Sequence, residues 1–190
     1  MSIELAAAAA AFLRERGVTL AEGLGEHELQ RVEERFGFEF GPDHRALLQL
    51  AVPLGDRWVD WRDDADQDIR ARLELPIDGV LFDVSNNAFW PRSWGVRPSS
   101  GAEAEQEARR HVRRWPKLIP IYGHRYMPAG PSIAGAPVLS VHQTDVIYYG
   151  ANLLDYLRRE LEPKPEESPP VTHPVPPWSE LAMGYDNENL

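Results

Sequence analysis

The sequence predicts a single α+β domain, with a central, mainly antiparallel sheet flanked by helices and a Pro-rich tail behind it. Two observations predict this fold class. Apolar residues in the first part of the chain follow helical spacing, whereas from Leu118 onward short β-branched and aromatic runs are typical of strands. The order of these segments contains no series of strand–helix–strand crossovers, which would indicate a parallel sheet. We expect the domain to cover residues 1–162 and the tail residues 163–190.

Composition narrows the class of function. A length of 190 residues suits one domain with a short appendage. Acidic residues outnumber basic ones by 30 to 20, and the net charge of −10 disfavours binding to nucleic acids or anionic membranes. The chain has no cysteine, which excludes disulfides, thiol nucleophiles and Cys–zinc sites. An acidic protein of this kind suits a basic protein partner.

The only long apolar run covers residues 5–13 and contains six consecutive alanines. It predicts an Ala-rich first helix within residues 1–18 that ends at Gly17. A membrane span needs about 20 apolar residues, and a signal peptide begins with a positively charged segment, which is missing here. We therefore expect a cytoplasmic protein.

Further helices follow in order. Apolar residues repeat on one face of residues 26–36, and Gly37 ends that helix. We expect a short extended segment at residues 38–40. The remaining expected helices of the first part cover residues 44–51, 64–75 and 103–115, with a short helical segment at residues 77–87 that is separated from the preceding helix by Pro76.

Three strands are expected at residues 118–122, 138–141 and 146–149. The last two are joined by a short polar link, so they should form a hairpin. Asn152 then caps a closing helix, whose buried stripe is formed by leucines up to Leu161.

The tail differs from the domain in composition. It holds 7 of the 17 prolines, and one lysine against five acidic residues gives it a charge of −4, which leaves −6 for residues 1–162. Proline at this density predicts an extended chain up to Pro177. Trp178 and Leu181 form an apolar island, which we expect to dock back on the domain or on a neighbouring molecule.

One segment resembles a known family. A helix that ends in Glu33-x-x-x-Gly37, a short aromatic stretch, Pro42 and the aliphatic pair Leu47–Leu48 are similar to the start of the SUKH superfamily, which includes the yeast cell-wall-assembly regulator and many bacterial immunity proteins. The resemblance extends over roughly residues 20–162. It implies a sheet-centred α+β domain without catalytic apparatus that neutralises bacterial toxins, often nucleases or deaminases, by binding them.

The search for catalytic and metal-binding patterns gives little. His111, His124 and His142 are potential ligands or general acid–base groups, with Asp145 close to the last of them. They lack the spacing of a known metal motif, and Asp145 is also a common turn former. No nucleophile elbow or nucleotide-binding loop is recognised, and the acidic run at residues 60–68 fits a solvated helix start. We assign no catalytic residue, metal or cofactor.

The aromatic residues are the stronger signal, because several lie in irregular segments rich in Pro, Asn, Asp and Gly. Two interpretations are open: the rings fill an irregular core, with arginines stacked on them, or they form a concave surface for a partner. The asparagines beside them either bond the local backbone or read a partner's backbone. The candidate partner-binding residues are Trp58, Trp61, Asn86, Asn87, Trp90, Arg92, Trp94, His124, Arg125 and Tyr126.

The leading hypothesis is a non-enzymatic protein-binding module, an immunity protein whose partner is a basic toxin such as a nuclease, without direct contact to nucleic acid or membrane. A second hypothesis is a small-molecule hydrolase or lyase that uses His124, His142 and Asp145 in a Trp-lined cleft. A third is a regulatory scaffold whose Pro-rich tail is the ligand of another domain.

Overall fold

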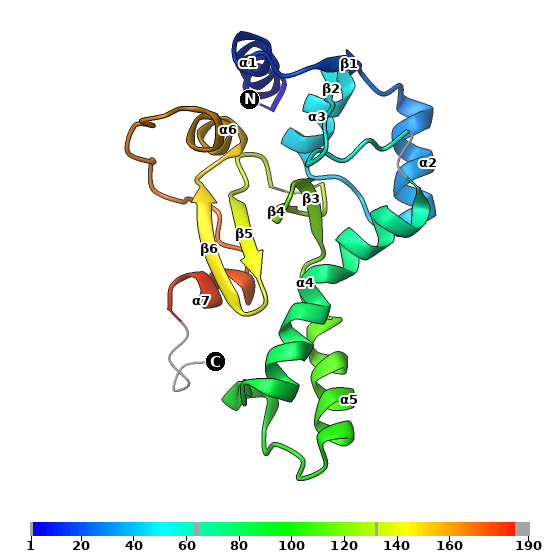
Figure 1. Cartoon of the computed structure of the whole chain (residues 1–190), viewed down its shortest axis with the longest axis vertical. Coiled ribbons are helices and arrows are strands. Elements are labelled where there is room, and N and C mark those ends of the chain that lie inside the picture. Colours follow the sequence, from blue (N-terminus) through cyan, green and yellow to red (C-terminus); the bar gives the residue numbers. More distant parts are fainter. Residues whose placement is uncertain (1, 63–64, 132, 185–190) are drawn as a thin grey trace.

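A computed structural model of the chain describes residues 2–62, 65–131 and 133–184 (Figure 1). Its helices and two antiparallel sheets form an α+β fold, which confirms the predicted class. The helices are α1 (Ser2–Glu15), α2 (Glu26–Phe36), α3 (Pro42–Leu50), α4 (Asp66–Asn86), α5 (Gly101–Val112), α6 (Leu153–Leu161) and α7 (Trp178–Ala182), with a 3-10 turn at Arg92–Trp94. The strands are β1 (Leu20–Glu22), β2 (Ala51–Pro53), β3 (Leu118–Tyr122), β4 (Arg125–Pro128), β5 (Val138–His142) and β6 (Asp145–Gly150).

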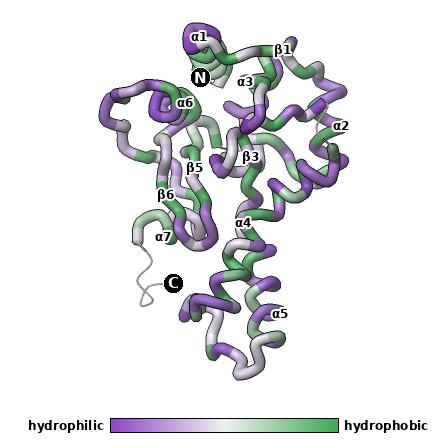
Figure 2. Tube along the Cα trace, viewed as in Figure 1, coloured by the Kyte–Doolittle hydropathy of each residue, from purple (hydrophilic) through white to green (hydrophobic). Residues whose placement is uncertain are grey.

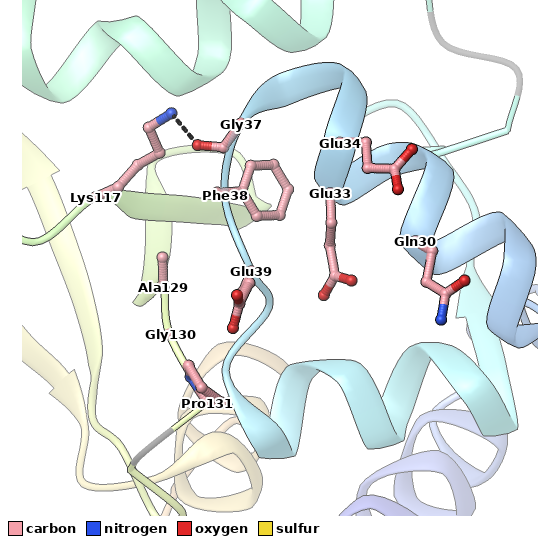
Figure 3. Close-up of a pocket in the computed structure, with 10 residues that line it drawn as sticks. All are labelled: Gln30, Glu33, Glu34, Gly37, Phe38, Glu39, Lys117, Ala129, Gly130 and Pro131. Atoms are coloured by element: carbon pink, nitrogen blue, oxygen red, sulfur yellow. Dashed lines mark hydrogen bonds between the residues drawn. The ribbon is translucent and has the colours of Figure 1, made fainter.

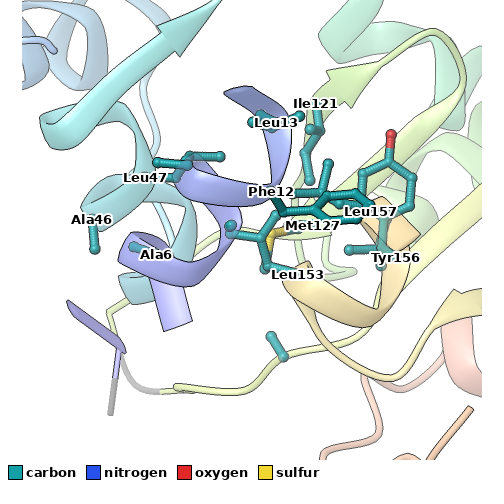
Figure 4. Packing of buried hydrophobic residues seen from close by; sticks show 14 of the residues in the cluster. Ala6, Phe12, Leu13, Ala46, Leu47, Ile121, Met127, Leu153, Tyr156 and Leu157 are labelled. Carbon is teal, nitrogen blue, oxygen red and sulfur yellow. The ribbon is translucent and has the colours of Figure 1, made fainter. Parts of the chain in front are cut away.

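The larger sheet is a meander of β3, β4, β5 and β6, in which each strand pairs with the next along the chain. One of its faces packs against α1, α3 and α6 around Phe12, Leu47 and Tyr156 (Figure 4). The opposite face packs against α4, α5 and α7 through residues such as Leu139 and Val141. Along the trace, hydrophobic residues concentrate on β5 and in the middle of α4, whereas α2 is largely hydrophilic (Figure 2).

A third apolar cluster lies beneath α2 and includes residues of α3, α4 and β2. The expected extended segment at residues 38–40 joins no strand, because Phe38 and Phe40 turn inward onto Trp61, with ring centroids 5.8 and 5.1 Å away. Residues 20–22 form a strand that was not predicted. It pairs with residues 51–53, and this pairing ends α3 at Leu50, one residue earlier than expected.

The expected break at Pro76 is wrong, because α4 continues through this proline. A proline inside a helix costs about 3 kcal/mol. Here Pro76 is itself buried, and the helix packs into apolar clusters on both sides of it, through Leu73 before and Val80 after. Burial of both halves outweighs the local cost, and the two segments therefore share one helical register.

The segment after β3 also departs from the prediction. No strand is expected between residues 122 and 138, but residues 125–128 form β4, the second strand of the meander. Gly123 has a positive φ of 54° and lies in the tight turn between β3 and β4. The strand was missed because Arg125, which it buries, breaks its apolar pattern.

The Pro-rich tail returns to the domain. Trp178 is only 1% exposed, and its indole Nε1 donates a hydrogen bond to the Pro116 carbonyl at 2.8 Å. Its ring lies edge-on to Trp115, with centroids 4.8 Å apart. Val175 and Leu181 are buried beside it in the same apolar cluster. The tail segment from Val175 to Leu181 therefore packs into the fold of this chain.

Helix length and composition bear on membrane insertion. Over the part of the chain that the structure describes, no helix is both long enough and apolar enough to cross a bilayer.

Candidate functional site

The first two predicted candidates, Trp58 and Trp61, are core residues. Both are less than 9% exposed. Trp58 packs on Tyr122, with ring centroids 4.7 Å apart, and the two residues also form a β-bridge. Trp61 lies among the phenylalanines beneath α2. Neither ring is available to a partner in this conformation.

Trp90 and Trp94 form a half-buried aromatic group beside α5. Their rings meet edge-on at 5.2 Å, and Trp94 stacks on the imidazole of His111 at 5.1 Å. The indole Nε1 of Trp90 donates a hydrogen bond to the Gly95 carbonyl. Arg92 is exposed next to them. These three candidates therefore share one end of the molecule, where a cavity of about 420 Å³ opens between α5 and the tail.

Asn86 and Asn87 form hydrogen bonds within the C-terminal end of α4. The amide of Asn86 donates to the Phe82 carbonyl at 2.9 Å, and that of Asn87 to the carboxylate of Asp83 at 2.5 Å. Both amides are thus engaged in local bonds, which is the first of the two interpretations that their sequence left open.

The last three candidates differ in how deeply their side chains are buried. Tyr126 is fully buried, its hydroxyl donates to the Arg72 carbonyl, and burial raises its pKa to about 12. Arg125 is also buried, and it forms an ion pair with Glu160 at 3.1 Å. His124 is partly exposed, and its pKa is lowered by burial and then by the charges of Arg125 and Arg57. The ten candidates therefore do not form one surface.

A different surface unites several polar and apolar groups. A groove of about 750 Å³ lies between α4 and the hairpin of β5 and β6, and we call it the α4–hairpin groove. It is lined by Leu75, Asp78, Gly79 and Phe82 of α4, His124 of the β3–β4 turn, Ser140, Val141, His142 and Gln143 of β5 and its turn, and Asp145 and Ile147 of β6.

Exposed apolar side chains gather at this groove. Seven large apolar residues are exposed in the described part of the chain, and three of them line it: Leu75 at 53%, Phe82 at 49% and Ile147 at 48%. Single exposed apolar residues are common on any protein, whereas several exposed apolar residues that line one groove make it a candidate interaction surface. None of the six tryptophans lines this groove.

The charged groups of the groove are acidic. Asp78 and Asp145 are exposed, one on each wall, and no arginine or lysine is among the lining residues. His124 and His142 lie close enough for the second to contribute to the lowered pKa of the first. At neutral pH the groove thus presents apolar surface between two carboxylates.

The two walls are held together at the base of the groove. Gly79 of α4 faces the backbone of Gln143 so closely that a Cβ atom there would lie 2.8 Å from the Gln143 Cα. One turn later, Asp83 accepts two hydrogen bonds from Thr144 at the hairpin tip. This close approach requires glycine at position 79, and it fixes the spacing of the walls.

The groove residues Leu75, Phe82 and Ile147 were not among the predicted candidates. A signal for two of them exists in the sequence: in an unbroken helix, Leu75 and Phe82 fall on the face opposite Ile69, Leu73 and Val80. The expected break at Pro76 removed this common register. Ile147 carries no comparable signal, because an alternating strand does not say which of its faces is covered.

A second groove lies along α2, beside residues 37–39 and 129–131 (Figure 3). Its acidic side chains include Glu33, whose carboxylate accepts the Phe40 backbone N–H and pairs with Arg45. Lys117 donates to the Gly37 carbonyl at the end of α2. These contacts stabilise the end of the helix, and we assign no ligand to this groove.

Within the described ranges, no group of three histidine or acidic side chains is placed to hold a metal ion. No family model, curated protein or solved structure matches this chain.

Proposed function

We propose that this protein is a non-enzymatic protein-binding module whose docking surface is the α4–hairpin groove. The observation that carries the proposal is the gathering of Leu75, Phe82 and Ile147 at one groove between two walls that are fixed to each other. Burial of exposed apolar side chains drives most protein association, and a rigid surface loses little entropy on binding.

We propose further that the partner is a basic bacterial toxin and that binding neutralises it in the cytoplasm. The net charge of −10 favours a basic partner, and so do Asp78 and Asp145, which form no ion pair among the described residues. Opposite charge accelerates association, and a nuclease that binds phosphates carries a basic surface of this kind. The resemblance of residues 33–48 to the start of SUKH immunity proteins supports the same class of partner.

Co-expression tests this function. The toxin genes encoded beside the gene for this protein are expressed in a sensitive host, alone and together with the full chain. We expect one toxin to lose its toxicity in the presence of the protein and to co-purify with it as a stable complex. The proposal is overturned when no toxin binds and no toxicity is relieved.

One observation favours a second candidate function, the hydrolase or lyase. The three residues that it needs, His124, His142 and Asp145, line the same groove, together with Ser140. Against it, the Ser140 hydroxyl already accepts a hydrogen bond from Arg125 at 2.7 Å, so its lone pairs are partly engaged. A panel of ester, amide and phosphodiester substrates tests it: activity that His142→Ala abolishes supports it, and absence of any turnover excludes it for these bond types.

A further inference from the structure

The wall of the groove that α4 contributes has a regular spacing. Leu75, Asp78 and Phe82 are all exposed and fall on one face of this helix, at positions i, i+3 and i+7. At 1.5 Å of rise per residue, the two apolar side chains lie about 10 Å apart along the axis, with the carboxylate between them. A complementary partner must therefore place two apolar side chains about 10 Å apart on one face.

This spacing distinguishes a helical partner from an extended one. A helix returns to the same face after seven residues, which reproduces the 10 Å separation (about 1.5 Å per residue). A step of three residues along an extended strand also covers about 10 Å. Successive side chains of a strand alternate between its two faces, so the side chain at i+3 points away from the face that carries the side chain at i. Two residues of a strand span only about 7 Å, and four span about 13 Å. The α4 wall thus matches a helix better than a strand.

The charges of the groove indicate which residue type a helical partner carries between its two apolar residues. Asp78 lies between Leu75 and Phe82, and Asp145 lies across the groove beside Ile147. Neither carboxylate has an ion pair within the described residues. A lysine or arginine at i+3 or i+4 of the partner helix, between its two apolar residues, meets this acidic centre.

We propose that the occupant of the α4–hairpin groove is an amphipathic helix of the partner, with apolar residues seven positions apart and a cation between them. This inference rests on the proposed protein-binding function and names the element of the partner that binds. The hairpin wall, with Ile147 and Asp145, covers the second side of that helix.

A designed peptide tests the inference with the full chain. The probe is a hydrocarbon-stapled helix of about 18 residues, because short isolated helices are marginal in water. It carries leucine at i and i+7 and lysine at i+3 and i+4. Binding is measured by fluorescence anisotropy. We expect Phe82→Asp to weaken binding by about tenfold or more. Val96→Asp is the matched control, because Val96 is 96% exposed outside the groove, and it should bind as the wild type does.

Two further peptides separate the alternatives. A peptide with glutamate in place of both lysines should bind the wild type several-fold more weakly, and Asp78→Lys should restore its binding. An unstapled peptide of the same composition with alternating leucines represents an extended partner. Equal or tighter binding of that extended peptide, or failure of the stapled helix to bind, overturns the inference.

The failure of this inference is distinguishable from that of the proposed function. Neutralisation of a toxin does not involve the peptides. If toxin rescue depends on Phe82 while the stapled helix does not bind, the groove is a docking surface for a partner element other than a helix. If toxin rescue is indifferent to Phe82, the proposed site itself is wrong.

Discussion

Asp83 of α4 holds Thr144, at the tip of the β5–β6 hairpin, through one carboxylate oxygen. This oxygen accepts the Thr144 backbone N–H at 2.9 Å and its hydroxyl at 2.5 Å. The other carboxylate oxygen accepts the amide of Asn87. Asp83 is only 4% exposed, so these bonds replace its hydration. The pair joins the helix wall of the groove to its sheet wall.

Loss of this link should destabilise the protein. Asp83→Ala leaves the half-buried Thr144 N–H and hydroxyl without their charged acceptor, which typically costs about 1–3 kcal/mol. The free energy of unfolding is measured by urea denaturation. Asp78→Ala is the matched control on the exposed side of the same helix and should change it by less than about 0.5 kcal/mol. Equal effects of the two substitutions would show that Asp83 does not connect the walls.

Much of the fold could be predicted from local patterns. The helix at residues 26–36 and the strand at residues 118–122 agree with the structure residue for residue, because an apolar repeat and a clear boundary residue coincide there. The short pairing of residues 20–22 with 51–53 was missed, since three-residue strands carry no period of their own. Local propensity also misjudged Pro76, where tertiary packing prevails over a local cost.

Because the tail docks on the domain through Trp178, we expect substitution of this residue to lower the free energy of unfolding strongly. Trp178→Ala removes a ring that is 1% exposed and its hydrogen bond to Pro116, and such losses cost about 3–5 kcal/mol. We expect a corresponding fall in the urea midpoint. Met183→Ala, at a position that is 69% exposed, is the control and should be nearly neutral. A change of less than about 1 kcal/mol for Trp178→Ala would place the tail outside the cooperative fold.

A buried ion pair beside the groove gives a prediction about coupling. Arg125 of β4 donates to Glu160 of α6 at 3.1 Å and to Ser140 at 2.7 Å, and it stacks on Tyr149 at 3.7 Å from the ring centroid. Arg125→Met or Glu160→Met alone leaves a buried charge unpaired and should cost about 3–5 kcal/mol.

The double substitution Arg125→Met with Glu160→Met removes both charges. Its loss of unfolding free energy should be clearly smaller than the sum of the two single losses, as a double-mutant cycle measures. Additive losses would contradict a direct interaction between these two side chains.

His44 predicts the acid sensitivity of the fold. It is buried between Phe40 and Trp61, its Nδ1 has no hydrogen-bond partner among the described residues, and burial lowers its pKa from 6.5 to about 3. Between pH 6.5 and pH 3, His44 therefore binds a proton in the unfolded chain but not in the folded chain. The contribution of this group to stability is fully present above pH 6.5 and is lost as the pH drops toward 3, by about 1.4 kcal/mol per pH unit.

The substitution His44→Phe removes this proton uptake and fills the same apolar site. We expect the variant to match or exceed the wild type at pH 7 and to lose less stability between pH 7 and pH 5, as urea midpoints at each pH report. Parallel pH profiles for the two proteins would show that another group controls the acid transition.

The candidate site was less accessible to sequence reasoning than the fold. Tryptophan in an irregular segment is compatible with an irregular core and with a partner surface, and Trp58 and Trp61 follow the first interpretation: they fill the spaces between packed elements, as large rings often do. The groove instead depends on Phe82 and Ile147, which lie 65 positions apart in the sequence and meet only through the contact of α4 with the hairpin. A local sequence pattern does not indicate that two such distant residues line the same groove.

The central claim is that the α4–hairpin groove is the surface through which this protein binds and neutralises its partner. The most direct measurement is the relief of toxicity by Phe82→Asp and by Val96→Asp, both expressed at the wild-type level, against the toxin that the wild type neutralises. The account predicts that Val96→Asp protects as the wild type does and that Phe82→Asp does not. Full protection by Phe82→Asp would contradict it.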